Sequence, residues 1–431
     1  MLDLGFTARN VLLGASLLGV VGGVLGCFAL LRRQSLLGDA LAHAALPGVC
    51  VAYLLTQSKS PGPLFAGALV AGALGSLLIL GVVRYSRVKE DSAIGIVLSV
   101  FFGAGIVLLT MIQKLPYGNQ SGLDKFLFGQ AATLMPRDIQ LMAVLGALVL
   151  AMVVLFYKEF KLLCFDREFG ASLGYPMRPL EIVLTLLLVV VVVVGLQTVG
   201  VVLMVATLVT PAAAARQWTE RLATMLVLAA LVGGGSGAVG ALLSASIPRL
   251  PTGPVIVLCS SAVLVASLVF APQRGLLWAW LRHRRMVGRI QRENLLKDLY
   301  LWGERRGGEW QRPVPWSLLM GTRGQTGGQL ERLARRLADR DHLTFESAGA
   351  QLTPSGFAAA EAIVRKHRLW ELYLTHRLEL ASDHVHRDAD AMEHTLSDEA
   401  LADLDALLGY PEVDPHGQPI PRATAPMGSA A

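Results

Sequence analysis

The sequence predicts an all-α polytopic membrane protein, with about eight or nine transmembrane helices, that continues into a C-terminal cytoplasmic domain. Hydrophobic residues make up 53% of the 431 residues and charged residues only 16%, which is too apolar for an ordinary water-soluble protein. The apolar character ends near Ala271. The first 272 residues hold 17 basic and 11 acidic residues, whereas the last 159 hold 21 of each, so the composition changes at a domain boundary.

Nine apolar segments approach the length needed to cross roughly 30 Å of bilayer hydrocarbon. They cover residues 11–31, 40–55, 63–83, 93–112, 139–157, 180–195, 199–215, 222–247 and 253–271. Only residues 196–198 separate the sixth segment from the seventh, which is too tight for two ordinary spans. One of the two is therefore expected to be a half-helix or a re-entrant segment, and the predicted number of spans is eight or nine.

Basic loops alternate with loops that are poorer in Lys and Arg. The basic connections lie at 32–33, 84–89, 158–161, 216–221 and 274–285. By the positive-inside rule, the N-terminus faces outward and the C-terminal domain lies in the cytoplasm. The first apolar segment leads directly into further spans, so we interpret it as a transmembrane helix and not as a cleaved signal. The four cysteines lack paired spacing and predict neither a disulfide framework nor a thiolate metal site.

Two metal-capable side chains, Asp39 and His43, lie in the otherwise apolar run LLGDALAHAALPG at 36–48. On a helix, residues four apart project from the same face, one turn above the other. A carboxylate and an imidazole suit a hard or borderline divalent cation, and an ionisable residue within a membrane span indicates a transport pathway. In the alternative interpretation, Asp39 only caps its helix and His43 is a packing residue.

Four runs resemble the permeases of zinc/manganese/iron-type ABC importers, and they occur in the order found in that family. They are LRRQSLLGD at 31–39 with the following His43 and Pro47-Gly48, KEDSAIGI at 89–96, FLFG at 126–129 and TPAA at 210–213. The resemblance covers about residues 11–270. It implies a bacterial plasma (inner) membrane location and a translocation path between two permease subunits. Asp39 and His43 are then expected to bind the metal transiently, because conduction requires binding that is weak enough for release.

The run CFDREFGASLGY at 164–175 mixes apolar and charged residues between the fifth and sixth apolar segments. It predicts a short amphipathic cytoplasmic helix that Gly174 terminates, with a plain loop as the alternative. In the permease family the ATPase subunit docks at this place. The coupling residues implied are Phe165, Asp166, Glu168, Phe169, Gly170, Leu173 and Gly174. The chain has no GxxxxGK[ST] motif, so ATP hydrolysis is expected in a separate ATP-binding subunit and not in this chain.

Beyond the permease domain at 1–272, the sequence predicts a basic juxtamembrane linker at 273–290, a folded domain at 291–421 and a disordered tail at 422–431. The basic residues of the linker are expected to contact anionic headgroups. Helices are expected over 290–300, 330–337 and 358–378, with a strand–turn–strand over 341–356 that forms a wing. Pro313, Pro315 and the glycine-rich run 321–328 occur where two regular helices of a helix-turn-helix would lie.

His and acidic residues recur at helical spacing near the C-terminus. His367 and Glu371 are four residues apart, and the donors of the next expected helix are His386, Asp390, Glu393 and His394. Nitrogen and oxygen donors without thiolate suggest Mn²⁺, Fe²⁺ or Zn²⁺, and a solvated charged face is the alternative.

Several runs of this domain resemble the iron- and manganese-dependent repressors of the diphtheria toxin repressor family. They include LTPSG at 352–356, RKHRLWE at 365–371, MEHTLSDE at 392–399 and DPHGQPIP at 414–421. The resemblance implies one metal site at His367, Glu371 and His386, and another at Asp390, Glu393 and His394. The family's first-helix ligands fall at Asn294 and Lys297. Lysine cannot coordinate a metal, and if it approached this face it would supply a positive charge in the metal's place.

The expected function is therefore that of the permease subunit of an ABC importer for manganese, zinc or iron, fused to a cytoplasmic metal-sensing domain. The permease needs no cofactor, whereas the C-terminal domain is expected to bind a divalent metal. The expected partners are an ATP-binding subunit, an extracytoplasmic metal-binding protein and a second permease subunit. Sequence-specific DNA binding is doubtful for a tethered domain.

Two other functions are alternatives for this sequence. One is a membrane-tethered or proteolytically released metal-dependent repressor. The other is a secondary transporter, which would need more intramembrane carboxylates for ion coupling than Asp39 provides.

Overall fold

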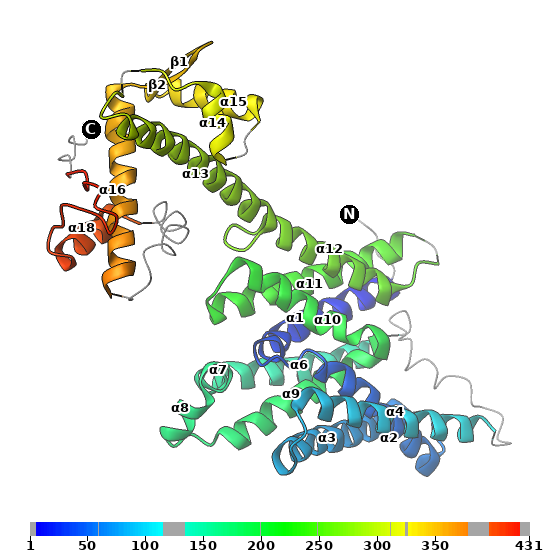
Figure 1. Cartoon of the computed structure of the whole chain (residues 1–431). Helices are drawn as coiled ribbons and strands as arrows, with labels where there is room; N and C mark the ends of the chain where they lie inside the picture. The colour runs from blue at the N-terminus through cyan, green and yellow to red at the C-terminus, as the bar shows by residue number, and fades with distance from the viewer. Residues whose placement is uncertain are drawn as a thin grey trace. The chain divides into compact units, whose positions relative to one another are not determined.

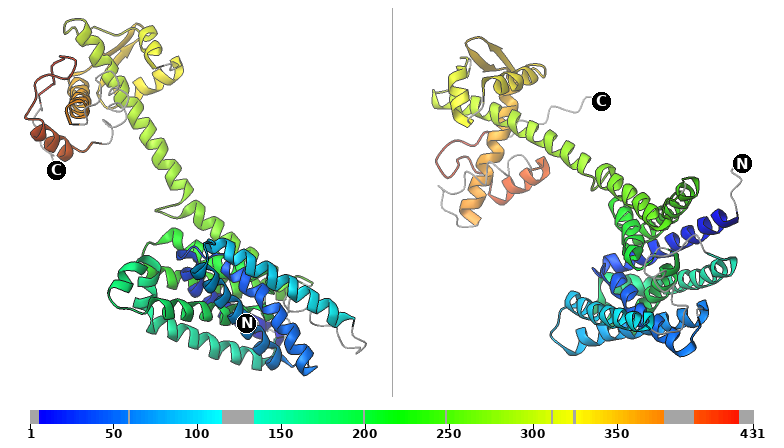
Figure 2. Two further views of the ribbon diagram at one scale, coloured as in Figure 1. Left: turned by 60° about the horizontal axis from the view of Figure 1, so that its bottom comes forward. Right: turned by 90° about the vertical axis from the view of Figure 1, so that its right-hand side faces the viewer.

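The computed structural model describes residues 6–58, 60–114, 134–198, 200–247, 249–310, 312–323, 326–377 and 396–422. The chain divides into two compact units, residues 1–279 and 280–431, whose helices are drawn in Figures 1 and 2. Helix α13 (Leu276–Arg305) begins in the first unit and continues into the second. Each unit has its own hydrophobic core and is described separately.

The first unit consists of helices. They are α1 (Phe6–Leu31), α2 (Leu37–Thr56), α3 (Pro61–Tyr85), α4 (Glu90–Gln113), α6 (Pro136–Leu155), α7 (Tyr157–Phe165), α8 (Arg167–Ser172), α9 (Met177–Thr198), α10 (Val201–Trp218), α11 (Leu222–Ser246) and α12 (Thr252–Phe270). Among the described residues, eight helices are long and apolar enough to cross a membrane: α1, α2, α3, α4, α6, α9, α11 and α12. This confirms the prediction of a polytopic membrane protein with eight or nine spans.

The crowded junction expected near residues 196–198 lies between α9 and α10. Helix α9 ends at Thr198, and α10 begins at Val201 directly after Gly200. Gly200 has a φ of 86°, in the left-handed region that glycine adopts without a steric penalty. Gly200 therefore takes, directly before α10, a backbone conformation that other residues adopt only with strain.

Helix α1 lies at the centre of the first unit, and its glycines allow neighbouring backbones to approach closely. A Cβ built on Gly19 would lie 2.1 Å from the carbonyl oxygen of Gly233 on α11. On the same side of the bundle, a Cβ on Gly26 would lie 1.9 Å from the carbonyl oxygen of Leu208 on α10. Small residues are the usual means of tight helix association in lipid, where hydrophobic driving force between helices is lacking.

The second unit is a small helical domain with a two-stranded wing. After α13 it contains α14 (Trp316–Arg323), α15 (Gly327–Ala338), β1 (Leu343–Glu346), β2 (Gly349–Leu352), α16 (Pro354–Arg377) and α18 (Asp398–Leu407). The strands pair antiparallel with Leu343 opposite Leu352, and Val314 adds an isolated bridge to Ala350. This confirms the expected winged-helix-like and helical architecture.

The boundaries differ from expectation at two places in the second unit. The wing ends at Leu352 and not at Gly356, because Pro354 opens α16, where a proline has no helical N–H to lose. The region of Pro315 and the glycine run also contains a helix, α14, which directly follows Pro315 and includes Gly321. Pro354 is thus the first residue of a helix and Pro315 directly precedes one, where the sequence pattern suggested interruption.

We expect Gly19→Ala to destabilise the first unit, because the new methyl group would force α1 and α11 apart. Overpacking of this kind costs about 1–3 kcal/mol. Gly103→Ala on α4 is the matched control, since nothing lies within 4 Å of its added methyl group. Thermal unfolding in detergent should show a lower melting temperature for Gly19→Ala alone. Equal melting temperatures for both variants would contradict the close α1–α11 contact.

Candidate functional site

Asp39 and His43 lie one turn apart on α2, as the sequence predicted. The imidazole Nε2 of His43 is 3.4 Å from the carboxylate Oδ1 of Asp39. Asp39 is in the first turn of the helix, where a negative charge is favoured by the helix dipole. No side-chain capping bond is present at this end of α2, so the interpretation of Asp39 as a simple cap finds no support in the geometry.

The pair belongs to a stripe of α2 that the rest of the unit leaves partly uncovered. Leu36 and Val51 are exposed, and Asp39, His43 and Pro47 between them are half-buried, whereas the intervening residues other than Gly48 are buried. These five residues recur every three or four positions and so share one face of the helix. The other faces of α2 pack against α3, α4, α9 and α10. The metal-capable pair therefore lies on the side of α2 that remains accessible.

His43 has further features that suit a ligand. Its ring lies edge-on against Phe102 of α4, with 4.6 Å between the ring centroids, which fixes the ring orientation. Its Nδ1 is buried and makes no hydrogen bond to any described residue. Pro47, four residues later, has no N–H, so the His43 carbonyl oxygen lacks its helical donor. The His43 imidazole nitrogen, the Asp39 carboxylate oxygens and the His43 carbonyl oxygen thus lie within about one turn of helix.

A buried ion network links the turn before α2 to the expected docking segment. Glu181 on α9 forms ion pairs with Arg32, at the end of α1, and with Arg167, the first residue of α8; the Arg167 Nη2–Glu181 Oε2 distance is 2.7 Å. The side chains of Arg32 and Glu181 are almost fully buried, and that of Arg167 is half exposed. One carboxylate therefore joins α8 and α9 to the end of α1, which is 149 residues away in the sequence.

The short helix expected near residues 164–175 is present as α8. Asp166 caps it by accepting a hydrogen bond from the Phe169 N–H at 2.9 Å. Gly174 ends it with a φ of 85°, and the Tyr175 N–H donates to the Gly170 carbonyl. Several exposed side chains are apolar: Phe165, Phe169 and Leu173 are each more than half exposed. Such an apolar cluster outside the span-long helices indicates a surface that a partner covers.

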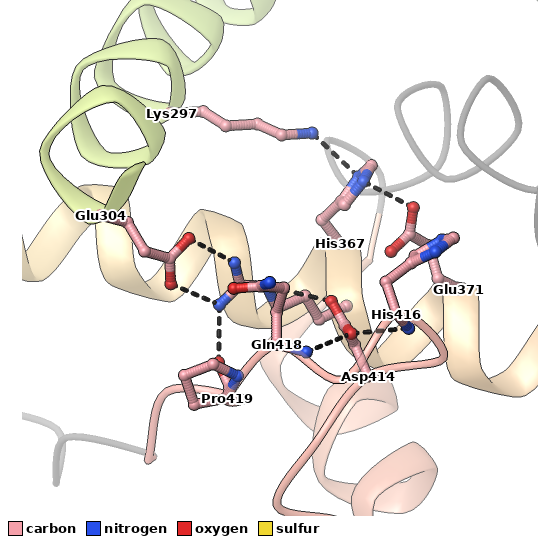
Figure 3. Close-up of polar contacts among 9 residues, drawn as sticks. Lys297, Glu304, His367, Glu371, Asp414, His416, Gln418 and Pro419 are labelled. Atoms are coloured by element: carbon pink, nitrogen blue, oxygen red, sulfur yellow. Dashed lines mark hydrogen bonds and ion pairs between the residues drawn. The ribbon is translucent and has the colours of Figure 1, made fainter. Parts of the chain in front are cut away.

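In the second unit, Lys297 of α13 reaches His367 of α16. Its Nζ lies 2.9 Å from the imidazole Nδ1, and the Nε2 of the same ring lies 3.0 Å from Glu371 Oε1 (Figure 3). All three residues are buried. Lys297 does approach the face of His367 and Glu371. In this arrangement an ammonium group and a carboxylate face the two ring nitrogens of His367.

Arg368 forms a second contact between the same helices. Its guanidinium donates two hydrogen bonds to Glu304 of α13, at 2.6 and 3.0 Å, and a third to the Pro419 carbonyl at 2.6 Å. Asp414 is also close, with its Oδ2 3.4 Å from Nε, while its Oδ1 accepts the N–H groups of His416 and Gln418 (Figure 3). The DPHGQPIP run therefore folds into a loop against α16.

Some predicted residues lie outside the described part of the chain. These are the FLFG run at 126–129 and the metal candidates His386, Asp390, Glu393 and His394. Within the described ranges, no three His, Cys, Asp or Glu side chains gather closely enough to hold a metal ion. The described geometry therefore brings together two pairs, Asp39 with His43 and His367 with Glu371.

The basic linker residues form the first half of α13 and meet further arginines from α15. Arg289 and Arg292 of α13 line a groove with Arg336 and Arg340. Burial, followed by repulsion from Arg340 and Arg336, lowers the pKa of Arg292. Nearby, the guanidinium of Arg284 stacks over the ring of Trp280 at 4.0 Å. Positive charge is thus concentrated on the helix that follows the last apolar span.

The apolar helices, the accessible polar pair on α2 and the exposed short helix α8 together are typical of a membrane permease. The chain belongs to the ABC 3 transport family, whose model matches residues 6–271. A second family model, described as iron dependent repressor, metal binding and dimerisation domain, matches residues 353–422. Both resemblances seen in the sequence are confirmed.

Named relatives cover one or both parts of the chain. The manganese transport system membrane protein MntC of Bacillus subtilis is 44% identical over 392 residues, covering 89% of this chain and 88% of that protein. The zinc transport system membrane protein TroC of Treponema pallidum is 49% identical, covering 67% of this chain and 96% of its own length. The solved structure of PsaBC from Streptococcus pneumoniae in complex with Fab is 31% identical with a TM-score of 0.57, covering 66% and 97%.

Sequence reasoning missed the Arg32–Glu181–Arg167 network and the Glu304–Arg368 contact. A signal for the first was available, because Glu181 stands at the start of a long apolar run, where a carboxylate needs a partner. Arg32 and Arg167 were the candidate cations, yet spacing alone could not pair residues 149 positions apart. The sequence also contained a signal for the free His43 carbonyl, because Pro47 follows four residues later and has no N–H to donate to it.

Proposed function

We propose that the chain is the membrane permease subunit of an ABC importer for a divalent transition metal, with manganese or zinc favoured over iron. The observation that carries this proposal is the accessible α2 stripe with Asp39 and His43 in a member of the ABC 3 transport family. The relatives named as manganese and zinc transport proteins support the choice of cargo.

The uncovered face of α2 also supports a second permease subunit as partner. A carboxylate that faced lipid would be costly, so Asp39 needs a polar path or a covering protein surface. A second copy, or a related permease, placed against this face encloses the stripe and turns it into a path. Asp39 Oδ1 and His43 Nε2 then hold the passing cation at a site with few protein ligands, from which it is released readily.

We assign ATP hydrolysis to a separate ATP-binding subunit that docks on α8. The exposed Phe165, Phe169 and Leu173 supply the apolar contact, and Asp166 with Gly174 fixes the length of the helix that presents them. Glu168 and Gly170 belong to the same helix. An extracytoplasmic metal-binding protein delivers the cation on the opposite side, and the second unit lies in the cytoplasm, as the basic loops indicate.

The ion network provides a route by which docking acts on the metal pair. Arg167 is part of the docking helix, Glu181 is buried beside it, and Arg32 stands seven residues before Asp39. A displacement of α8 therefore moves the carboxylate that holds the turn between α1 and α2. We infer that Glu181 and Arg167 position this turn and do not contact the cargo.

For the second unit we propose divalent metal binding through His386, Asp390, Glu393 and His394. The match to a metal binding and dimerisation domain supports this assignment, as does the helical spacing of the four donors. We infer fewer than two tight sites in each chain, because position 297 carries lysine where a ligand is expected.

We expect Asp39→Ala and His43→Ala each to reduce metal uptake by at least about 10- to 100-fold, the range observed when even an outer partner of a metal ligand is removed. Uptake of radioactive manganese and zinc by cells measures this effect. Thr56→Val, at the exposed end of the same helix, is the control and should transport normally. Parental transport by both pair variants, with assembly unchanged, would show that the pair is structural.

We expect a cysteine placed at Ser172 of α8 to crosslink to the ATP-binding subunit in the assembled transporter. Burial raises the pKa of the native Cys164 thiol to about 11, so that group stays protonated and reacts slowly. Cys259→Ser removes another partly accessible thiol. Ser86→Cys, exposed in another loop predicted to be cytoplasmic, is the control. An active complex in which Ser172→Cys gives no crosslink excludes α8 as the docking helix.

We expect Arg167→Gln to lower the amount of metal transported per ATP hydrolysed, because it removes only the outer arm of the network. The expected decrease is about two- to fivefold, corresponding to the 0.5–1 kcal/mol of a half-exposed ion pair. Arg178→Gln, an exposed arginine on α9, is the matched control. Transport and ATPase activity are measured together in proteoliposomes. An unchanged ratio for Arg167→Gln rules out coupling through this network.

A further inference from the structure

We propose that the Lys297 ammonium group permanently replaces a metal ion at His367 and Glu371, so that this site holds α13 against α16 without binding a divalent cation. The inference deepens the proposed function, because it concerns which part of the second unit responds to metal. It rests on the buried arrangement of Lys297, His367 and Glu371 in Figure 3.

The hydrogen-bonding chemistry of the three groups determines the state of the imidazole. An ammonium group can only donate, so the His367 Nδ1, 2.9 Å from Lys297 Nζ, must accept. A neutral ring then carries its proton on Nε2, which faces the Glu371 carboxylate at 3.0 Å. A metal needs a ring nitrogen with a free lone pair. An ammonium nitrogen and a carboxylate oxygen thus lie within 3.0 Å of the two ring nitrogens of His367, and a metal ion could bind the ring only by displacing one of them.

The charges of these three residues balance one another. The Lys297 ammonium group is positive, the Glu371 carboxylate is negative, and the ring of His367 lies between them. A divalent cation entering here would meet the ammonium group at close range in a buried setting, where repulsion is poorly screened. Glu371 is the carboxylate whose charge a bound metal ion would otherwise compensate. Lys297 supplies that positive charge from within the chain.

A second contact of the same kind lies two turns further along α13. Glu304 follows Lys297 by seven residues and therefore shares its face of the helix. Glu304 pairs with Arg368, the residue next to His367 on α16. Two polar contacts thus join the helices. At the first, α13 supplies the positive charge of Lys297 to His367; at the second, α13 supplies the negative charge of Glu304 to Arg368. The α13–α16 contact is consequently independent of metal supply.

The test counts Mn²⁺ bound to the full chain in detergent, by equilibrium dialysis with elemental analysis. All samples carry Asp39→Ala and His43→Ala, which removes binding at the permease pair. His367→Gln should leave the Mn²⁺ count unchanged. Lys297→Glu should gain about one Mn²⁺ per chain by restoring an oxygen ligand, and adding His367→Gln should abolish that gain. Lys297→Met, which removes the charge but adds no ligand, should gain none.

Thermal unfolding provides a readout that does not depend on counting. Lys297→Met should lower the melting temperature of the second unit, and Mn²⁺ should not restore it, whereas Mn²⁺ should raise that of Lys297→Glu. A loss of Mn²⁺ on His367→Gln in the parental Lys297 chain overturns the proposal, as does a Lys297→Glu chain that gains no Mn²⁺. The importer function is tested separately, by measuring metal uptake by the chain with Asp39 and His43 intact.

Discussion

The requirement that ionisable groups find partners within the protein governs both units. In a membrane, charged side chains lack water and are retained only where other groups or a polar path compensate them. Glu181 illustrates this requirement, since Arg32 and Arg167 converge on it from two other segments. Because of these contacts, the turn that leads into α2 has a defined position. The orientation of the Asp39–His43 pair depends on that turn.

Close backbone packing is the other condition for this arrangement. Gly19 and Gly26 let α1 lie against α11 and α10, and this packing holds the end of α1 in place. Arg32 directly follows that end. The glycines therefore contribute to the site at a distance: they contact no metal-capable residue, yet they fix the helix from which the Arg32–Glu181 pair starts. Packing and charge pairing act on the same short turn.

Sequence patterns predicted the features that depend on nearby residues. Apolar length gave the spans, the i, i+4 spacing gave the Asp39–His43 pair, and Gly174 gave the end of α8. Features that depend on distant segments were not predictable in this way. Glu181 gains its partners only when α1, α8 and α9 assemble, and Pro354 acted through its compatibility with a first helical turn, where the pattern suggested a strand.

The two carboxylate–histidine pairs show how the surroundings determine what a common spacing does. Both pairs are four residues apart on a helix, at 3.4 Å for Asp39–His43 and 3.0 Å for His367–Glu371. The first pair has side chains that are 32% and 18% exposed, and the Nδ1 of His43 has no hydrogen-bond partner among the described residues. The second has side chains that are only 11% and 2% exposed, with a lysine on its histidine. An open pair without a resident cation can exchange a metal ion, whereas a closed pair with one is fixed. We therefore propose that a carboxylate and an imidazole at the same spacing serve passage of the metal in one unit and helix contact in the other.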